Sequence, residues 1–204
     1  MEIKVDKKSG LFLGVIATLL VVIVALLTLQ NDNSSDMGHG SHGGMGTSAA
    51  AGDLTGSEVM FLQMMIPHHQ QAVDISNLAL KQSSNPELLA LAKIILKEQS
   101  AEITQMNNWL SQANAGTDPG HSMDGMAGML SDSDLMALES STGKKFDELW
   151  LTGMIAHHDG AVDMVGMIND AKNPEIKSFG ENVIKVQLAE IAKMRELLNK
   201  IKLS

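Results

Sequence analysis

Two pairs of adjacent histidines are the residues of this 204-residue chain best suited to bind a metal ion. The stretch "MIPHHQQAVD" (65–74) contains His68 and His69, and "MIAHHDGAVD" (154–163) contains His157 and His158. Neighbouring residues on a helix point about 100° apart, so the histidines of each pair flank one apolar face. Imidazole binds zinc, copper and iron, and two such pairs therefore indicate a metal site.

Each histidine pair is followed further along the chain by a stretch that contains hydrogen-bond acceptors and a thioether. The stretches "QSAEITQM" (99–106) and "QLAEIAKM" (187–194) each place a glutamine, a glutamate and a methionine on an apolar helical stripe. Antiparallel pairing puts these residues level with the histidines. Besides the histidines, Gln99 and Gln187, the predicted layer contains the candidate metal ligands Met65, Glu102, Met106, Met154, Glu190 and Met194. Burial of such groups is costly unless they bind one another, water or a metal, so a metal site and a hydrogen-bonded layer that only fixes helix register both remain open.

Two glycine-rich stretches contain the other three histidines. All seven histidines of the chain lie in the two helical pairs or in these stretches, and the chain has 15 methionines. We expect these stretches to be flexible loops that capture or hand over Cu(I). Their candidate ligands are Met37, His39, His42 and Met45 in the first, and His121, Met123, Met126 and Met129 in the second.

The choice of metal follows from the ligand types. Imidazole and carboxylate alone would suit zinc or iron. Thioethers are soft ligands, and their presence favours copper, as Cu(I) on methionine and Cu(II) on histidine.

The elements that must position these residues are helices in a repeated hairpin. Residues 62–74 match 151–163, and Asn85-Pro86-Glu87 recurs at 173–175. Helix-start signals and apolar periodicity predict helices over 55–82, 85–112, 143–171 and 174–202, with a short helix within 131–141. On the first helix, Phe61, Met65, Ala72, Ile75 and Leu80 define the expected core face. No strand pattern competes, so we predict an all-α, ferritin-like four-helix bundle over 55–204, built from repeats 55–112 and 143–202 around a methionine-rich linker, 113–142.

The N-terminal residues predict a membrane anchor. Residues 11–29 form an uncharged apolar run of the length that spans a bilayer, and Lys4, Lys7 and Lys8 precede it. We therefore expect residues 1–10 in the cytoplasm, 11–29 in the cytoplasmic (inner) membrane, a flexible linker over 30–54, and the remaining chain in the periplasm or extracellular space. A cleaved signal peptide is the competing interpretation.

Composition excludes several classes of function. The chain has no cysteine, which rules out thiolate metal sites and cysteine nucleophiles. Its net charge of −9 and single arginine, Arg195, argue against a nucleic-acid partner.

The motif "MIPHHQQAVD", with "GMAGMLSDSD" and "MIAHHDGAVD", resembles the bacterial domain-of-unknown-function family 305. The hallmark of that family is a M-I-x-H-H-x-x-A helix preceded by a G-M-x-x-M-L/M-S segment. The resemblance covers about residue 55 to the end in two tandem copies and implies a ferritin-like fold and periplasmic copper binding linked to copper resistance. It implies ligation by Met65, His68, His69, Met154, His157 and His158, with Met123, Met126 and Met129 matching the methionine segment. The second copy has Gly153 and Ala156 in place of Met64 and Pro67, so we expect the copies to differ in affinity.

Three functional classes follow. The first is a membrane-anchored, extracytoplasmic copper-binding protein for sequestration, transfer or resistance, with copper ions and another copper-handling protein as partners. The second is a ferritin-like metal-dependent oxidoreductase, which the absent Glu-x-x-His pairs disfavour because Gln105 and Lys193 follow Glu102 and Glu190. No catalytic residue is nominated. The third is a structural bundle whose His/Glu layer only specifies packing.

Overall fold

All regular structure in the described part of the chain is helical, as predicted. The computed structural model describes residues 53–120 and 125–203. Its elements are α2 (Gly56–Gln82), α3 (Pro86–Gln112), α4 (Asp132–Glu139), α5 (Gly143–Val165), a 3₁₀ turn η1 (Gly166–Ile168) and α6 (Pro174–Leu203).

The predicted membrane anchor, 11–29, lies outside the described residues. No helix within the described ranges is long and apolar enough to cross a membrane. Nearly all of the predicted linker 30–54 also lies outside, together with the candidate ligands Met37, His39, His42, Met45, His121 and Met123.

The helices begin where side chains can cap them. Thr55 and Glu58 form a capping box at the start of α2, and the side chain of Asn85 accepts from the backbone N–H groups of Glu87 and Leu88. Asn173 repeats this cap for Glu175 at the start of α6. The first backbone N–H groups of a helix lack intrahelical partners, so these caps fix the predicted starts.

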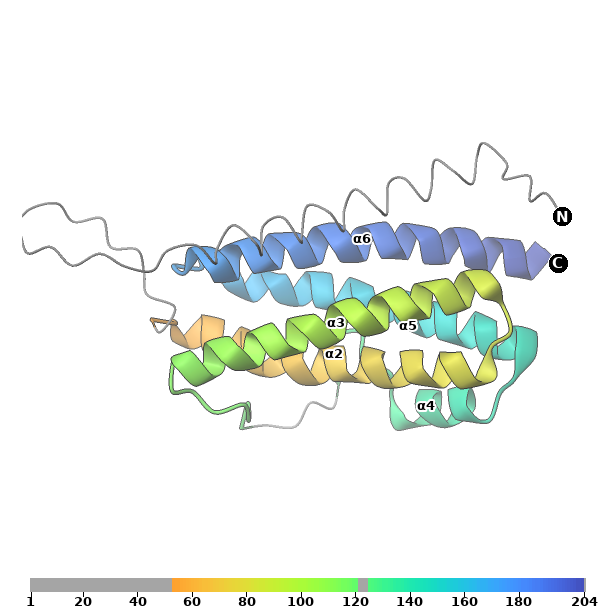
Figure 1. Ribbon diagram of the computed structural model, residues 1–204, viewed down its shortest axis with the longest axis horizontal. Coiled ribbons are helices and arrows are strands. Elements are labelled where there is room, and N and C mark those ends of the chain that lie inside the picture. Colours follow the sequence, from red (N-terminus) through yellow and green to blue (C-terminus); the bar gives the residue numbers. More distant parts are fainter. Residues whose placement is uncertain (1–52, 121–124, 204) are drawn as a thin grey trace, which may run out of the picture. The chain divides into compact units, whose positions relative to one another are not determined.

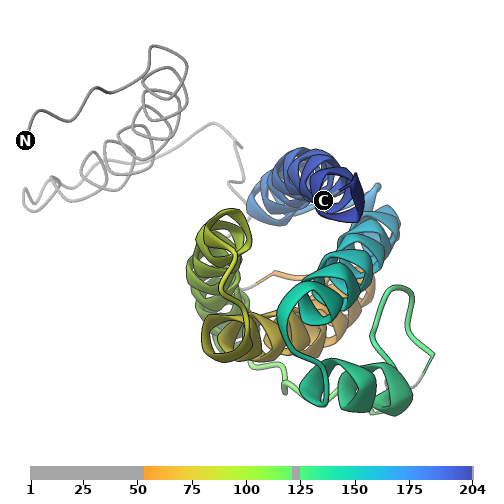
Figure 2. The ribbon, with the colours of Figure 1, turned by 90° about the vertical axis from the view of Figure 1, so that its right-hand side faces the viewer.

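The four long helices form two hairpins that meet through α2 and α5. Helix α2 packs along α3, and α5 along α6, whereas α3 and α6 touch only slightly (Figure 1). The end-on view in Figure 2 shows this arrangement, with α4 outside the bundle beside α5. The short helix expected within 131–141 is thus present but is not part of the bundle.

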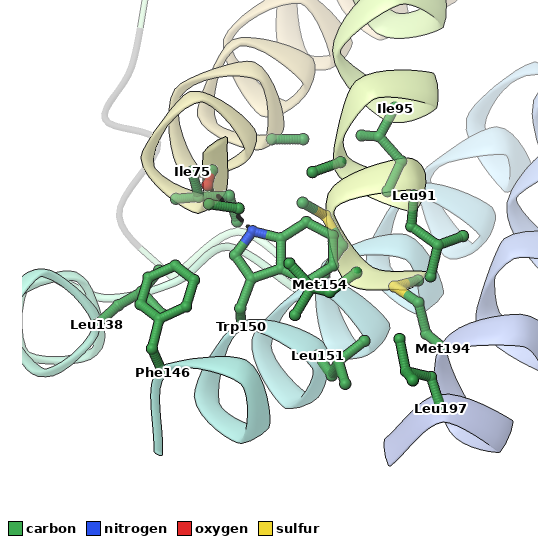
Figure 3. Packing of buried hydrophobic residues seen from close by; sticks show 14 of the residues in the cluster. Ile75, Leu91, Ile95, Leu138, Phe146, Trp150, Leu151, Met154, Met194 and Leu197 are labelled. Carbon is green, nitrogen blue, oxygen red and sulfur yellow. Dashed lines mark hydrogen bonds between the residues drawn. The ribbon is translucent and has the colours of Figure 1, made fainter. Parts of the chain in front are cut away.

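Two apolar clusters fill the two ends of the bundle. In one, the indole N–H of Trp150 donates to the backbone carbonyl of Ile75 at 3.0 Å, which satisfies its polar atom inside the core (Figure 3). We call this the Trp150 cluster, and it includes Ala72, Ile75, Ile95, Phe146, Trp150, Met154, Met194 and Leu197. The other, the Phe61 cluster, includes Phe61, Leu62, Met65, Met106, Trp109, Met164, Phe179 and Val183.

Two buried carboxylates tie each hairpin to the turn of the other. Glu58 accepts from the backbone N–H groups of Lys172 and Asn173 in the α5–α6 turn, both at 2.8 Å. At the aligned position in α5, Asp147 accepts from the hydroxyl of Ser83 in the α2–α3 turn at 2.6 Å. These contacts set the position of one hairpin against the other along the bundle axis.

Two details differ from prediction. Helix α5 ends at Val165 instead of 171, because the chain tightens into η1 at Gly166, a weak helix former, and buries Ile168. Leu80 is 37% exposed and not in the core, because Ala79 takes the inward position of that turn.

Candidate metal centre

The four histidines lie in a polar layer between the two apolar clusters. All four are fully buried on α2 and α5, and Gln99 and Gln187 from α3 and α6 are nearly so. The side chain of Glu102 is 17% exposed and that of Glu190 is 6% exposed. The structure therefore brings together the residues that the sequence placed in one layer.

One ring nitrogen of each histidine is held by an acceptor. His69 Nε2 lies 2.8 Å from Glu102 Oε2, and His158 Nε2 lies 2.9 Å from Glu190 Oε2. His157 Nε2 lies 3.0 Å from the backbone carbonyl oxygen of His68. The fourth, His68 Nε2, lies 3.3 Å from the carbonyl oxygen of Ala127. Carbonyl and carboxylate oxygens accept, so each Nε2 carries a hydrogen, and in a neutral imidazole with this tautomer Nδ1 keeps a lone pair.

Those lone pairs have no partner. In the described part of the chain, Nδ1 of all four histidines is buried without a hydrogen bond. The same holds for both amide atoms of Gln99, for Gln187 Oε1 and for Glu190 Oε1. An unsatisfied buried polar atom costs roughly 1–3 kcal/mol, so a layer with this many marks a place for a ligand.

The two central histidines are uncharged near neutral pH. Burial, together with the neighbouring His69, lowers the pKa of His68 to about 3. Burial, together with the neighbouring His68, holds the pKa of His157 well below its usual value. Their rings are tilted by 36° with centroids 3.8 Å apart, an approach that two charged imidazolium rings would resist.

Carboxylates on α3 and α6 give a negative charge to the side of the layer that faces the histidine-bearing helices α2 and α5. Glu102 and Glu190 belong to the layer, and Glu98 lies one turn before Glu102 on α3. Partial burial of its carboxyl, with Glu190 and Glu102 nearby, raises the pKa of Glu98 to about 7. A cation in the layer would relieve this repulsion.

Buried thioethers lie in the two apolar clusters on either side of the histidine layer. Met65 and Met106 are fully buried in the Phe61 cluster, and Met154 and Met194 are fully buried in the Trp150 cluster. Among the described residues, no three histidine, aspartate or glutamate side chains form a group that could hold a metal ion. Imidazole nitrogen in the layer and thioether sulfur in the clusters beside it are the donor types that these buried residues offer.

Sequence reasoning missed the residues that hold the methionine segment 125–130 on the bundle. The stretch 121–129 was expected to be a flexible loop, but Gln71 bonds both backbone groups of Leu130 at the end of segment 125–130. Met126 and Met129 are partly buried as a result. A signal was present in the sequence, because Gln71 and Gly160 occupy aligned positions at which the two histidine motifs differ.

The fold and this layer define an all-α bundle protein with a candidate histidine–methionine metal centre. Residues 58–198 match the family described as domain of unknown function DUF305, and the chain belongs to this family. One match spans both hairpins. No curated protein matches the chain.

Solved structures of similar proteins include three informative ones. A DUF305 protein from Streptomyces coelicolor, assigned as secreted, is 26% identical to this chain with a TM-score of 0.68. The match covers 72% of this chain and 94% of the Streptomyces coelicolor chain. A DUF305 fragment from Deinococcus radiodurans is 30% identical with a TM-score of 0.67, covering 72% and 98%. CopM in its Cu(I)-bound form is 32% identical with a TM-score of 0.60, covering 70% and 96%. CopM structures are also known in Cu(II)-bound and Ag-bound forms.

Proposed function

We propose that this protein binds copper in its histidine–methionine layer, for sequestration, transfer or resistance. The observation that carries the proposal is the set of four buried histidines whose Nε2–H groups are all engaged and whose Nδ1 lone pairs are all unpaired. A structural layer would be expected to satisfy its own polar atoms. Similarity to CopM, which is known in Cu(I)-bound and Cu(II)-bound forms, supports copper as the metal.

The donor set fits copper better than zinc or iron. Nδ1 of the histidines would supply nitrogen, and the buried thioethers would supply sulfur, a soft ligand that suits Cu(I). Glu102 and Glu190 were predicted as ligands. In the structure their Oε2 atoms bond His69 and His158, so we assign them to orienting those rings and raising their basicity. We assign ligation to the histidines with Met65, Met106, Met154 and Met194.

We also propose that the copper-binding domain lies outside the cytoplasm, anchored through residues 11–29. The lysines before that apolar run and the secreted assignment of the Streptomyces coelicolor relative support this location. The histidines and methionines at 37–45, with His121 and Met123, would collect Cu(I) or pass it to a copper-handling partner.

Metal titration tests the proposal. The metal-free full chain in detergent is titrated with Cu(I) and Cu(II) against competing chelators, with zinc as the comparison metal. We expect binding tighter than micromolar for at least one copper state and weaker binding of zinc. The double variant His68→Ala/His157→Ala should lose this site, whereas Asp74→Ala, on the exposed face of α2, should keep it.

Two results would favour other functions. Unchanged copper uptake by the double variant, accompanied by a melted bundle, would identify the layer as purely structural. Catalytic turnover of Cu(I) or Fe(II) with oxygen would identify an oxidoreductase.

A further inference from the structure

The methionine segment 125–130 is fixed to α2 by side-chain hydrogen bonds. Gln71 Nε2 donates to the carbonyl oxygen of Leu130 at 3.0 Å, and Gln71 Oε1 accepts from the backbone N–H of Leu130 at 2.8 Å. His68 Nε2–H donates to the carbonyl oxygen of Ala127. The segment is thus held at Ala127 and at its last residue, Leu130, and one of the residues that bond it is a histidine of the layer.

Glycines on α5 give the same segment its space. A Cβ atom at Gly160 would overlap the carbonyl oxygen of Ala127, and one at Gly153 would lie 3.1 Å from Leu130 Cδ2. Within the segment, Gly128 has φ +80°, and a Cβ there would lie 2.5 Å from the carbonyl oxygen of Ala156. The segment therefore runs in close contact with α5. A side chain at position 128 or 160 would collide with backbone and displace the segment, whereas one at position 153 would shift only the Leu130 side chain.

The two histidine motifs differ where they touch this segment. Gln71 on α2 aligns with Gly160 on α5, and Met64 aligns with Gly153. The α2 motif therefore supplies the clamping side chain, Gln71, and the α5 motif supplies glycines that leave space for the segment. Glycine at 71 would remove the clamp, and glutamine at 160 would collide with the segment. These differences make the layer asymmetric, because His68 bonds the segment while His157 bonds the backbone of His68.

Docking brings Met126 to the His68 side of the layer. Met126 directly precedes Ala127, the acceptor of His68, and packs against the Phe61 cluster, which contains Met65 and Met106. Met129 takes a different course and lines a groove with Gly153 and Ala156 beside α4. Met126 is therefore the thioether of the segment that can join the layer.

We infer that Gln71 and Gly160 are positioning residues that dock segment 125–130, so that Met126 adds a thioether to the His68 side and favours soft monovalent cations there. The inference rests on the proposed copper binding. It adds the residues that position one half of the site, and it adds a preference of that half for Cu(I) and Ag(I) over Cu(II).

Hydrogen exchange and paired metal titrations on the full chain test this inference. We expect Gln71→Ala and Gly160→Ala to speed amide exchange within 125–130, including at Leu130, in the absence of metal. Both variants should weaken Cu(I) and Ag(I) binding about tenfold or more while leaving Cu(II) binding within a factor of about three, since misplaced supporting residues cost roughly 10–100-fold in metal affinity. Met126→Leu should weaken Cu(I) binding to a similar degree without faster exchange at Leu130.

Matched controls separate docking from general damage. Gln70→Ala changes the neighbouring glutamine, whose side chain bonds Asp74 on the surface, and Gly56→Ala adds a methyl group at an exposed position of α2 where a Cβ would meet no neighbouring atom within 4 Å. Both should behave as wild type. Two results would overturn the inference even if the wild-type chain binds copper. In one, Gln71→Ala and Gly160→Ala weaken Cu(I) and Cu(II) binding equally. In the other, these variants exchange amide hydrogens faster within 125–130 but bind Cu(I) as wild type does. A wild-type chain that binds no copper would overturn the proposed function and the metal part of the inference, and the exchange data would still decide the docking.

Discussion

Each histidine of the layer has one ring nitrogen fixed by the protein and one left free. The bonded Nε2–H groups fix the orientation of each ring and, in the neutral imidazole, its tautomer. His68 and His157 are already neutral at pH 6–7, because burial lowers their pKa values. Copper therefore need not displace a proton from these two rings.

Replacing the two layer carboxylates should weaken copper binding. Glu102→Gln and Glu190→Gln each keep an acceptor for the histidine N–H but remove the charge that raises ligand basicity. We expect each variant to bind copper roughly 10–100-fold more weakly, measured by chelator competition. Glu181→Gln is the control because it removes a carboxylate from an exposed position of α6 that has no histidine partner. An equal loss in that control would show that only net charge matters.

Acid should destabilise the metal-free bundle through its central histidines. Unfolded histidines protonate near pH 6.5, whereas folded His68 does so only at about pH 3 and His157 also well below 6.5. The unfolded chain therefore binds more protons in this window, and stability falls as pH drops from about 6.5 towards 3. Each histidine contributes about 1.4 kcal/mol per pH unit.

Urea unfolding of the metal-free chain between pH 7 and pH 4 measures this slope. His157→Asn should reduce it by about one proton. A slope that the variant leaves unchanged would contradict the assignment to the layer histidines.

At the scale of elements, local signals predicted the helices well. Thr55, Asn85 and Asn173 are strong caps, and the helices that follow them begin within a residue of prediction. Hairpin register placed Glu102 within about a turn of the level of His68 and His69, but it did not indicate which of the two histidines Glu102 bonds. Helix ends that depend on tertiary packing were harder to predict from the sequence. Helix α5 is shorter than predicted because Ile168 is buried in the Phe61 cluster.

The docked segment shows what one-dimensional patterns leave open. Its composition, rich in glycine and methionine, predicts a loop, and its contacts with Gln71 and Gly160 are tertiary. The same limit applies to Glu102 and Glu190, because periodicity placed them in the layer but could not distinguish a metal ligand from a hydrogen-bond acceptor. In the structure both carboxylates accept from histidines of the layer.

The buried carboxylate of Glu58 should be a major link between the two hairpins. Burial alone would raise its pKa, but donors from Asn173, Thr55 and Lys172 hold the pKa of Glu58 below its usual value. Glu58→Ala would leave those backbone N–H groups without an acceptor, and we expect a loss of roughly 3 kcal/mol in unfolding free energy. Glu87→Ala, at an exposed carboxyl near a helix start, is the control and should cost under about 1 kcal/mol. Similar losses in urea unfolding for both variants would contradict this role.

At the scale of the whole molecule, the polar layer interrupts what could be one continuous apolar core. The Phe61 and Trp150 clusters meet at a level that contains histidines, glutamines and glutamates instead of aliphatic side chains. Unpaired buried atoms there oppose folding, so the layer is better explained by binding than by stability. Copper should correspondingly stabilise the fold, because a ligand that binds only the native state raises unfolding free energy.

Apolar replacement of complete His–Glu pairs separates binding from packing. In the variant His69→Leu/Glu102→Leu, both partners are removed together, so no charge or N–H is left unpaired, and such exchanges are often neutral or stabilising. We expect the variant to melt at or above the temperature of the metal-free wild type, to bind copper more weakly, and to gain less stability when copper is added. The variant His69→Leu alone should be less stable than the pair, because it leaves Glu102 without its donor. Thermal melts with and without copper measure both effects. A double variant that unfolds more readily than His69→Leu would show that the layer holds the bundle together in its own right.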